Sequence, residues 1–195
     1  MTISLSKGQG LSLAKNTGLS RVTVGLGWDP AKPSGGFFSK MLGGGGEGAI
    51  DLDASVIVLD AQKQTLDTIW FQKLQGMNGA IRHSGDNRTG EGDGDDESIA
   101  IDLEKLPAEA IHLVVTVNSF LGQPFDKVEN AVCRLVDNAD GKELCRFTLS
   151  EKGSHTGVIM AVLTRASGAW EMKAIGEVAN GRTARDLSTA AARVV

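Results

Sequence analysis

The chain has 195 residues, of which 41% are apolar and 23% charged, with 25 Gly and 4 Pro. This composition predicts one soluble globular domain over residues 1–195 and excludes collagen-like, mucin-like and globally disordered chains. The formal net charge of −4 leaves no excess of basic residues for a phosphate backbone, so we expect no nucleic-acid partner.

Short β-strands are the main feature predicted along the chain. Two alternating runs, 3–8 and 11–16, are joined across Gly8-Gln9-Gly10 and predict an N-terminal β-hairpin. Turn signals such as Asn78-Gly79 separate the later runs, and no long helical periodicity interrupts them, so we predict a mainly β fold, a two-sheet antiparallel β-sandwich. These later strands are expected at 22–26, 55–59, 68–74, 98–103, 113–117, 131–136, 144–149, 158–164 and 170–175.

Two segments differ from this pattern. Residues 31–48 are rich in Gly and predict a loop insertion. The insertion is not expected to bind phosphate, because no Gly-Lys-Ser/Thr follows and the next predicted element is a strand. From Thr183 the chain becomes rich in Ala, and Thr183 with Asp186 can form a capping box, so we predict a short C-terminal helix.

Acidic residues are concentrated at 86–97, which hold six acids and one base, a net charge of −5. Gly90, Gly92 and Gly94 alternate with these acids and allow sharp turns that bring carboxylate and carbonyl oxygens together. Oxygen ligands in this number suit Ca²⁺, whereas Zn²⁺ would require His or Cys, which the segment lacks. The sequence therefore predicts a calcium site, with a solvated acidic loop as the alternative.

A second acidic pair, Asp51 and Asp53, opens a predicted strand. Residues two apart on a strand point to the same face, and two adjacent carboxylates repel unless a cation or a proton lies between them. The acidic loop is not an EF-hand, because counting from Asp86 puts Glu91 where the Gly of that loop belongs. The pair and the loop therefore indicate a metal site of another kind, or a merely exposed strand end.

Cys133 and Cys145 lie in apolar strand-like runs, which favours reduced thiols and a cytoplasmic protein over a secreted, disulfide-linked one. Apolar strand positions also argue against reactive thiols. The first ten residues lack a basic segment followed by an apolar core, and the longest uncharged apolar stretch, 157–163, is far shorter than the roughly 20 residues that cross a bilayer. We therefore expect neither a signal peptide nor a membrane span.

Several motifs occur in a specific order along nearly the whole chain: Gly25-Leu26-Gly27-Trp28-Asp29, Asp51-Leu52-Asp53-Ala54-Ser55, residues 83–97, Ile101-Asp102-Leu103, residues 117–120, Asn130-Ala131 and residues 153–157. This set resembles the TerD family of tellurium-resistance and stress-response proteins, and residues 67–71 and 118–120 are similar to its TerZ branch. The resemblance implies a bacterial β-sandwich with calcium-binding acidic loops at one end and no catalytic activity.

The resemblance also implies the metal ligands, residue by residue. They are Asp51 and Asp53 at the strand end, Asp86, Asn87, Asp93, Asp95, Asp96 and Glu97 in the loop, and the carbonyl groups of Gly90 and Gly92. This set exceeds the roughly six to eight oxygens that one Ca²⁺ accepts, so two ions are expected. His83 is expected to be a neutral neighbour of a carboxylate rather than a ligand.

The leading functional hypothesis is a non-enzymatic calcium-binding protein that acts with other stress-response proteins; its oligomeric state stays open. Two alternatives remain. In one, the Asp cluster holds cations for a metal-dependent hydrolase, although the sequence offers no distinct general base. In the other, Ca²⁺ bridges the acidic loops to an anionic membrane surface.

Overall fold

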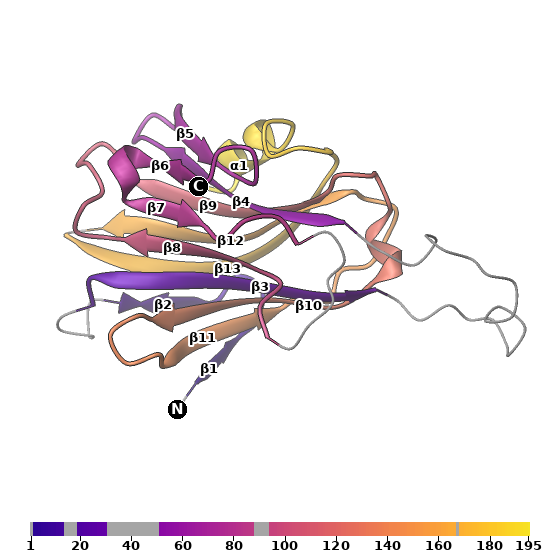
Figure 1. The fold of residues 1–195 in the computed structure, drawn as a ribbon, viewed down its shortest axis with the longest axis horizontal. Coiled ribbons are helices and arrows are strands. Elements are labelled where there is room, and N and C mark those ends of the chain that lie inside the picture. Colours follow the sequence, from indigo (N-terminus) through magenta and orange to yellow (C-terminus); the bar gives the residue numbers. More distant parts are fainter. Residues whose placement is uncertain (1, 14–18, 31–50, 88–93, 167) are drawn as a thin grey trace, which may run out of the picture.

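The structure, a computed structural model, describes residues 2–13, 19–30, 51–87, 94–166 and 168–195. Two β-sheets pack face to face (Figure 1). The first has the strand order β1-β11-β10-β3-β8-β7-β6 and the second has the order β2-β13-β12-β9-β4-β5. The prediction of a two-sheet β-sandwich is confirmed, and the pairs are antiparallel except for β1 with β11.

The first sheet contains β1 (Ile3–Leu5), β3 (Arg21–Pro30), β6 (Gln75–Gly76), β7 (Ile81–His83), β8 (Glu97–Asp102), β10 (Val128–Asp137) and β11 (Glu143–Thr148). The second contains β2 (Gly10–Ser12), β4 (Leu52–Leu59), β5 (Thr65–Ile69), β9 (His112–Ser119), β12 (Gly157–Ala166) and β13 (Ala169–Ala179). Two 3₁₀ turns, η3 (Met77–Gly79) and η4 (Phe125–Lys127), and one helix, α1 (Ser188–Arg193), complete the described elements.

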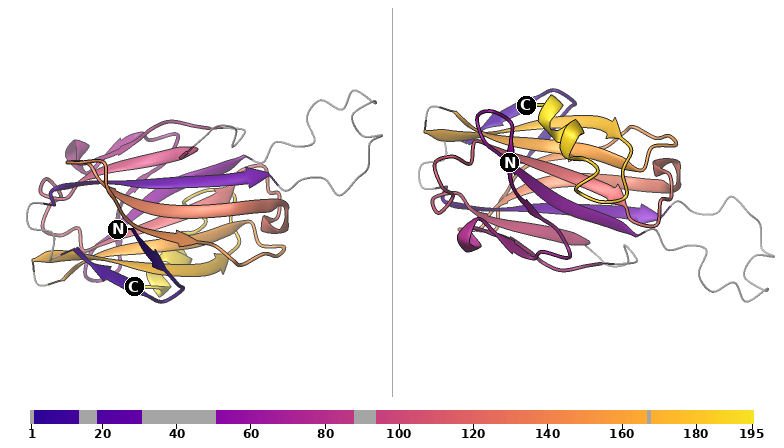
Figure 2. Two further views of the ribbon diagram at one scale, coloured as in Figure 1. Left: turned by 90° about the horizontal axis from the view of Figure 1, so that it is seen from below. Right: turned by 90° about the horizontal axis from the view of Figure 1, so that it is seen from above.

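The core lies between the sheets, where alternate residues of each strand point inward. A second apolar cluster lies on the outer face of the second sheet, where Leu187 and Ala191 of the C-terminal segment cover Ile57, Leu59 and Val114. Figure 2 shows this segment crossing that face. All eight residues of β4 are therefore buried, because the core covers one face of the strand and the C-terminal segment covers the other.

The predicted N-terminal hairpin is wrong. β1 pairs with β11 of the first sheet, and β2 pairs with β13 of the second, so the two runs join different sheets. Gly8, with a φ of 83°, lies between the runs, and its N–H donates to the Ala174 carbonyl oxygen at 2.8 Å. The longer strands β11 and β13 offer open edges, and each short run pairs with one of them instead of with the other run.

Two other predicted elements are displaced. The strand expected at 68–74 lies earlier, as β5, and residues Trp70 and Lys73 instead close a tight turn through two backbone hydrogen bonds. The C-terminal helix exists but begins at Ser188. Thr183 donates to the Asp186 carboxylate at 3.0 Å from both its N–H and its hydroxyl, but these bonds close a turn before the helix.

The Gly-rich insertion predicted at 31–48 lies outside the described residues. Within the described ranges, the structure contains no helix with the length and apolar character required to span a bilayer. The end of β3, the start of β4 and the loop between β7 and β8 lie at one end of the sandwich (Figure 1). Of the acidic residues singled out in the sequence, Asp51, Asp53 and Asp86 lie at this end.

Candidate metal centre

Three acidic side chains from two segments converge at this end of the sandwich. Asp51 precedes β4, Asp53 lies on it, and Asp86 follows β7; each offers a carboxylate oxygen, and these oxygens lie within 4.8 Å of one another. Asp51 and Asp53 are buried, with 7% and 2% of their surface exposed, and Asp86 is exposed. The structure thus brings together three of the ten predicted ligands, whose role as metal ligands stays a prediction.

The electrostatics of this cluster favour a bound cation. Burial, together with the negative charges of Glu97, Asp51 and Asp86, raises the pKa of Asp53 to about 8. A hydrogen bond from Asn118 opposes this shift. Without a cation the cluster therefore retains a proton at neutral pH, and a divalent ion could replace that proton.

Asn118 is a polar residue of this site that the ligand prediction omitted. It lies on β9, where it is the register partner of Asp53, and its Nδ2 donates to Asp53 Oδ2 at 3.1 Å and to the Arg182 carbonyl oxygen at 2.8 Å. Its Oδ1 is buried and has no hydrogen-bond partner among the described residues. Because the amide nitrogen is the atom that faces Asp53, Asn118 orients the Asp53 carboxylate within the cluster.

Glu97 forms a structural link between the two sheets. Its Oε2 accepts a hydrogen bond from the Ala54 N–H at 2.7 Å, and its Oε1 accepts one from the Asn87 N–H at 3.1 Å. β5 pairs with β4 only from Val56 onward, so the Ala54 peptide groups have no strand partner on that side. The side chain of Glu97 supplies the missing acceptor.

His83 completes this link. Its Nε2 lies 3.1 Å from the Ala54 carbonyl oxygen and 3.4 Å from Glu97 Oε2, while the Gly85 N–H donates to Nδ1 at 3.0 Å. Because Nδ1 accepts a hydrogen bond, we assign the proton to Nε2, which then donates to the carbonyl group of Ala54. His83 is therefore a buried neighbour of a carboxylate, as its place in the sequence suggested.

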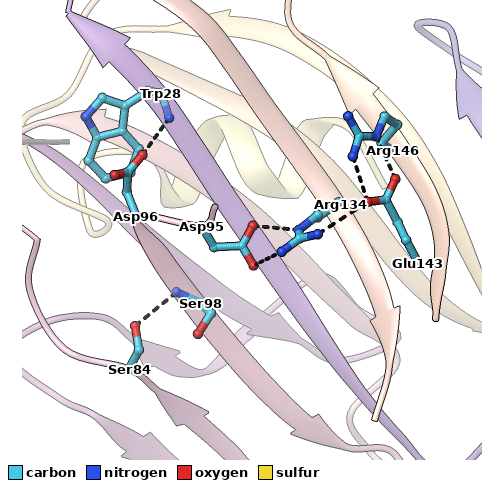
Figure 3. Close-up of polar contacts among 8 residues, drawn as sticks. All are labelled: Trp28, Ser84, Asp95, Asp96, Ser98, Arg134, Glu143 and Arg146. Carbon is cyan, nitrogen blue, oxygen red and sulfur yellow. Dashed lines mark hydrogen bonds and ion pairs between the residues drawn. The ribbon is translucent and has the colours of Figure 1, made fainter. Parts of the chain in front are cut away.

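Asp95 and Asp96 bond to two further strands (Figure 3). Asp96 Oδ2 accepts a hydrogen bond from the Trp28 N–H of β3 at 2.8 Å, and its Oδ1 accepts one from Asn87 Nδ2 at 3.1 Å. Asp95 forms a bidentate ion pair with Arg134 of β10, with Nε–Oδ1 and Nη2–Oδ2 distances of 2.7 and 3.0 Å. The consecutive acids Asp95, Asp96 and Glu97 thus contact three different strands. The remaining predicted ligands lie outside the described residues: Gly90, Gly92 and Asp93.

The two cysteines belong to the hydrophobic core. Both are free and buried. Burial raises the pKa of both thiols, that of Cys145 to about 11. A protonated, enclosed thiol is a poor nucleophile, so direct reaction of these cysteines with oxidants is not favoured.

The sequence and the fold of this chain are similar to those of known proteins. Residues 1–188 match the model of the TerD domain. The chain is 51% identical to the tellurium resistance protein TerZ of Serratia marcescens, over 95% of this chain and 94% of that protein. It is 43% identical to the stress response protein SCP2 of Bacillus subtilis, over 96% and 98% of the two chains. A solved TerD homologue from Streptomyces coelicolor has the same fold, with a TM-score of 0.65 at 24% identity, over 88% of this chain and 96% of that one.

Proposed function

The chain belongs to the TerD family of tellurium-resistance and stress-response proteins, and we propose that it acts as a calcium-binding protein without catalytic activity. We place it in the bacterial cytoplasm, where it would act through other stress-response proteins. The observation that carries the proposal is the convergence of three carboxylates, two of them buried. Burying several like charges is costly unless a cation neutralises them.

The donor set fits a hard cation. Asp51, Asp53 and Asp86 would hold the ion through carboxylate oxygens, and Asn118 would orient Asp53 through its amide N–H. Ca²⁺ supplies positive charge and accepts several protein oxygens at once, which Mg²⁺ does less readily. Asp95, Asp96 and Glu97 already bond to the protein. Of the other ligands expected from the sequence, Gly90, Gly92 and Asp93 lie outside the described residues.

Calcium is expected to bind the chelator-stripped protein and to stabilise it. With a Kd in the sensor range of roughly 10⁻⁷ to 10⁻⁵ M, the gain is about 2.7 kcal/mol when free calcium is about one hundred times Kd. Asp51→Asn removes one converging carboxylate and should abolish most of this gain. Calorimetric titration and thermal unfolding, with Mg²⁺ in parallel, measure both effects.

Asp60→Asn is the matched control for this charge change. Asp60 follows the other end of β4, and its Oδ1 accepts hydrogen bonds from the Gln62 and Gln64 N–H groups, which an Asn oxygen can also accept. This variant should bind calcium as wild type does. Equal loss of binding in both variants, or no binding by the wild-type protein, would contradict the proposed site.

One observation favours the membrane-surface alternative as a second candidate. Leu121 has 58% of its surface exposed. The preceding residue, Phe120, donates its N–H to the Asp51 carbonyl oxygen at 3.1 Å, so the exposed side chain of Leu121 lies beside the acidic cluster.

If calcium bridges this end to anionic lipid, the protein should sediment with phosphatidylserine vesicles only in calcium, and Leu121→Ser should weaken that association. Equal sedimentation with chelator rules this candidate out.

A further inference from the structure

Arg134 holds the C-terminal end of the acidic loop on the outer face of the first sheet (Figure 3). Arg134 is the register partner of Gly25 on β3, and Gly25 is in turn the partner of Ser98 on β8. Gly25 has no side chain, and the Asp95 carboxylate occupies that space: a Cβ at Gly25 would lie 2.1 Å from Asp95 Oδ2. This vacancy lets Asp95 reach across β3 to Arg134.

The Asp95–Arg134 pair is connected to the acidic cluster through a short series of contacts. Asp96, next in the chain, accepts a hydrogen bond from Asn87 Nδ2 at 3.1 Å, and Glu97 accepts one from the Asn87 N–H at 3.1 Å. Asn87 directly follows Asp86, which among the described residues of this loop is the one that meets Asp51 and Asp53. The position of Asp86 therefore depends on where the segment from Asp95 is held.

From these contacts we infer that Arg134 is a positioning residue for the calcium site: it holds Asp95 so that Asp86 faces the carboxylates of Asp51 and Asp53. This inference rests on the proposed function. Asp95 then anchors the loop instead of contributing to a metal, because both of its carboxylate oxygens are engaged by one guanidinium group. A bidentate Arg–carboxylate pair fixes orientation as well as distance, which a Lys could not do.

Arg134 also contacts a second carboxylate, that of Glu143. Glu143 on β11 lies 3.4 Å from Arg134 Nη1 and also pairs with Arg146, at 2.6 and 2.7 Å. Arg146 therefore shares a partner with Arg134, and its guanidinium group donates to Glu143 rather than to Asp95. Arg146→Gln is for this reason a matched control for Arg134→Gln, with the same change of charge and side-chain type on the adjacent strand.

Arg134→Gln is expected to weaken calcium binding by about 10-fold or more, the usual effect of losing a residue that orients metal ligands. In the calcium-free protein it should also speed amide hydrogen exchange at Asn87 and Asp96, while Arg146→Gln leaves affinity and exchange unchanged. Thermal unfolding shows whether each variant is folded. If Arg134→Gln retains wild-type affinity and exchange, the inference is overturned.

A double-mutant cycle separates anchoring from ligation. If Asp95 acts only through Arg134, then Asp95→Asn, Arg134→Gln and the double variant should all weaken calcium binding to the same extent. If Asp95 binds the metal directly, Asp95→Asn should cost far more than Arg134→Gln, which refutes the anchoring role. Should the wild-type protein bind no calcium, the proposed function fails, whereas the exchange comparison in calcium-free protein still decides whether Arg134 positions the loop.

Discussion

Glu97→Ala is expected to lower the free energy of unfolding of the calcium-free protein by about 3 kcal/mol. Glu97 is 1% exposed, and its side chain accepts hydrogen bonds from the Ala54 and Asn87 N–H groups. Each buried amide left without an acceptor costs about 1–3 kcal/mol, and the truncation also leaves a cavity. Urea unfolding with excess chelator measures the loss, and the exposed Glu109→Ala serves as the control for removing one acidic side chain.

The sign of this change tests the role of Glu97. Its charge raises the pKa of Asp53, so the two carboxylates repel each other in the folded protein. If Glu97 were present chiefly to bind a metal, its removal would relieve this repulsion and stabilise the calcium-free chain. An increase in stability would therefore contradict the structural link between the sheets, and the expected decrease would support it.

Local sequence patterns are sufficient to predict the strands that face the core. Alternation along β3 and β8 reflects burial of one face, and this pattern is visible in the sequence. The prediction of an N-terminal hairpin was wrong for a different reason. The strands at residues 3–5 and 10–12 are too short to specify a partner, and each pairs with a strand more than 130 residues away in the chain. Strand pairing over such a distance leaves no local signal.

The acidic cluster was only partly predictable for the same reason. The two-residue spacing of Asp51 and Asp53 places them on one strand face, and the density of acids after His83 marks the loop. Asn118 is 65 residues from Asp53, so its contact depends on the register of β4 with β9. The bonds of Asp95 and Glu97 depend likewise on Arg134 and Ala54, which lie on other strands.

The stability of the calcium-free protein is expected to fall as the pH rises from about 4 to about 8. Burial, with the charges of Glu97, Asp51 and Asp86, raises the pKa of Asp53 from 3.8 to about 8. Between these values the folded protein keeps a proton on Asp53 that the unfolded chain has lost, so each unit of rising pH disfavours folding by up to about 1.4 kcal/mol. Below about pH 4 both states are protonated, and this dependence ends.

Asp53→Asn should remove this pH dependence and stabilise the calcium-free protein near pH 8, because the amide has the same shape and no charge to bury. Asp60→Asn should keep the wild-type profile, and urea midpoints measured in chelator between about pH 5 and about pH 8 compare the three proteins. If Asp53→Asn has the pH profile of the wild-type protein, Asp53 titrates normally and its burial does not favour a bound cation.

The same proton competes with calcium for Asp53, so calcium affinity should weaken up to about 10-fold for each pH unit below about 8. Saturating calcium should also remove the fall in stability. As the pH rises, a fall in the stability of the calcium-free protein together with a rise in calcium affinity would tie both effects to one carboxylate. If the stability fell in the same way at saturating calcium, the ion would not be bound by Asp53.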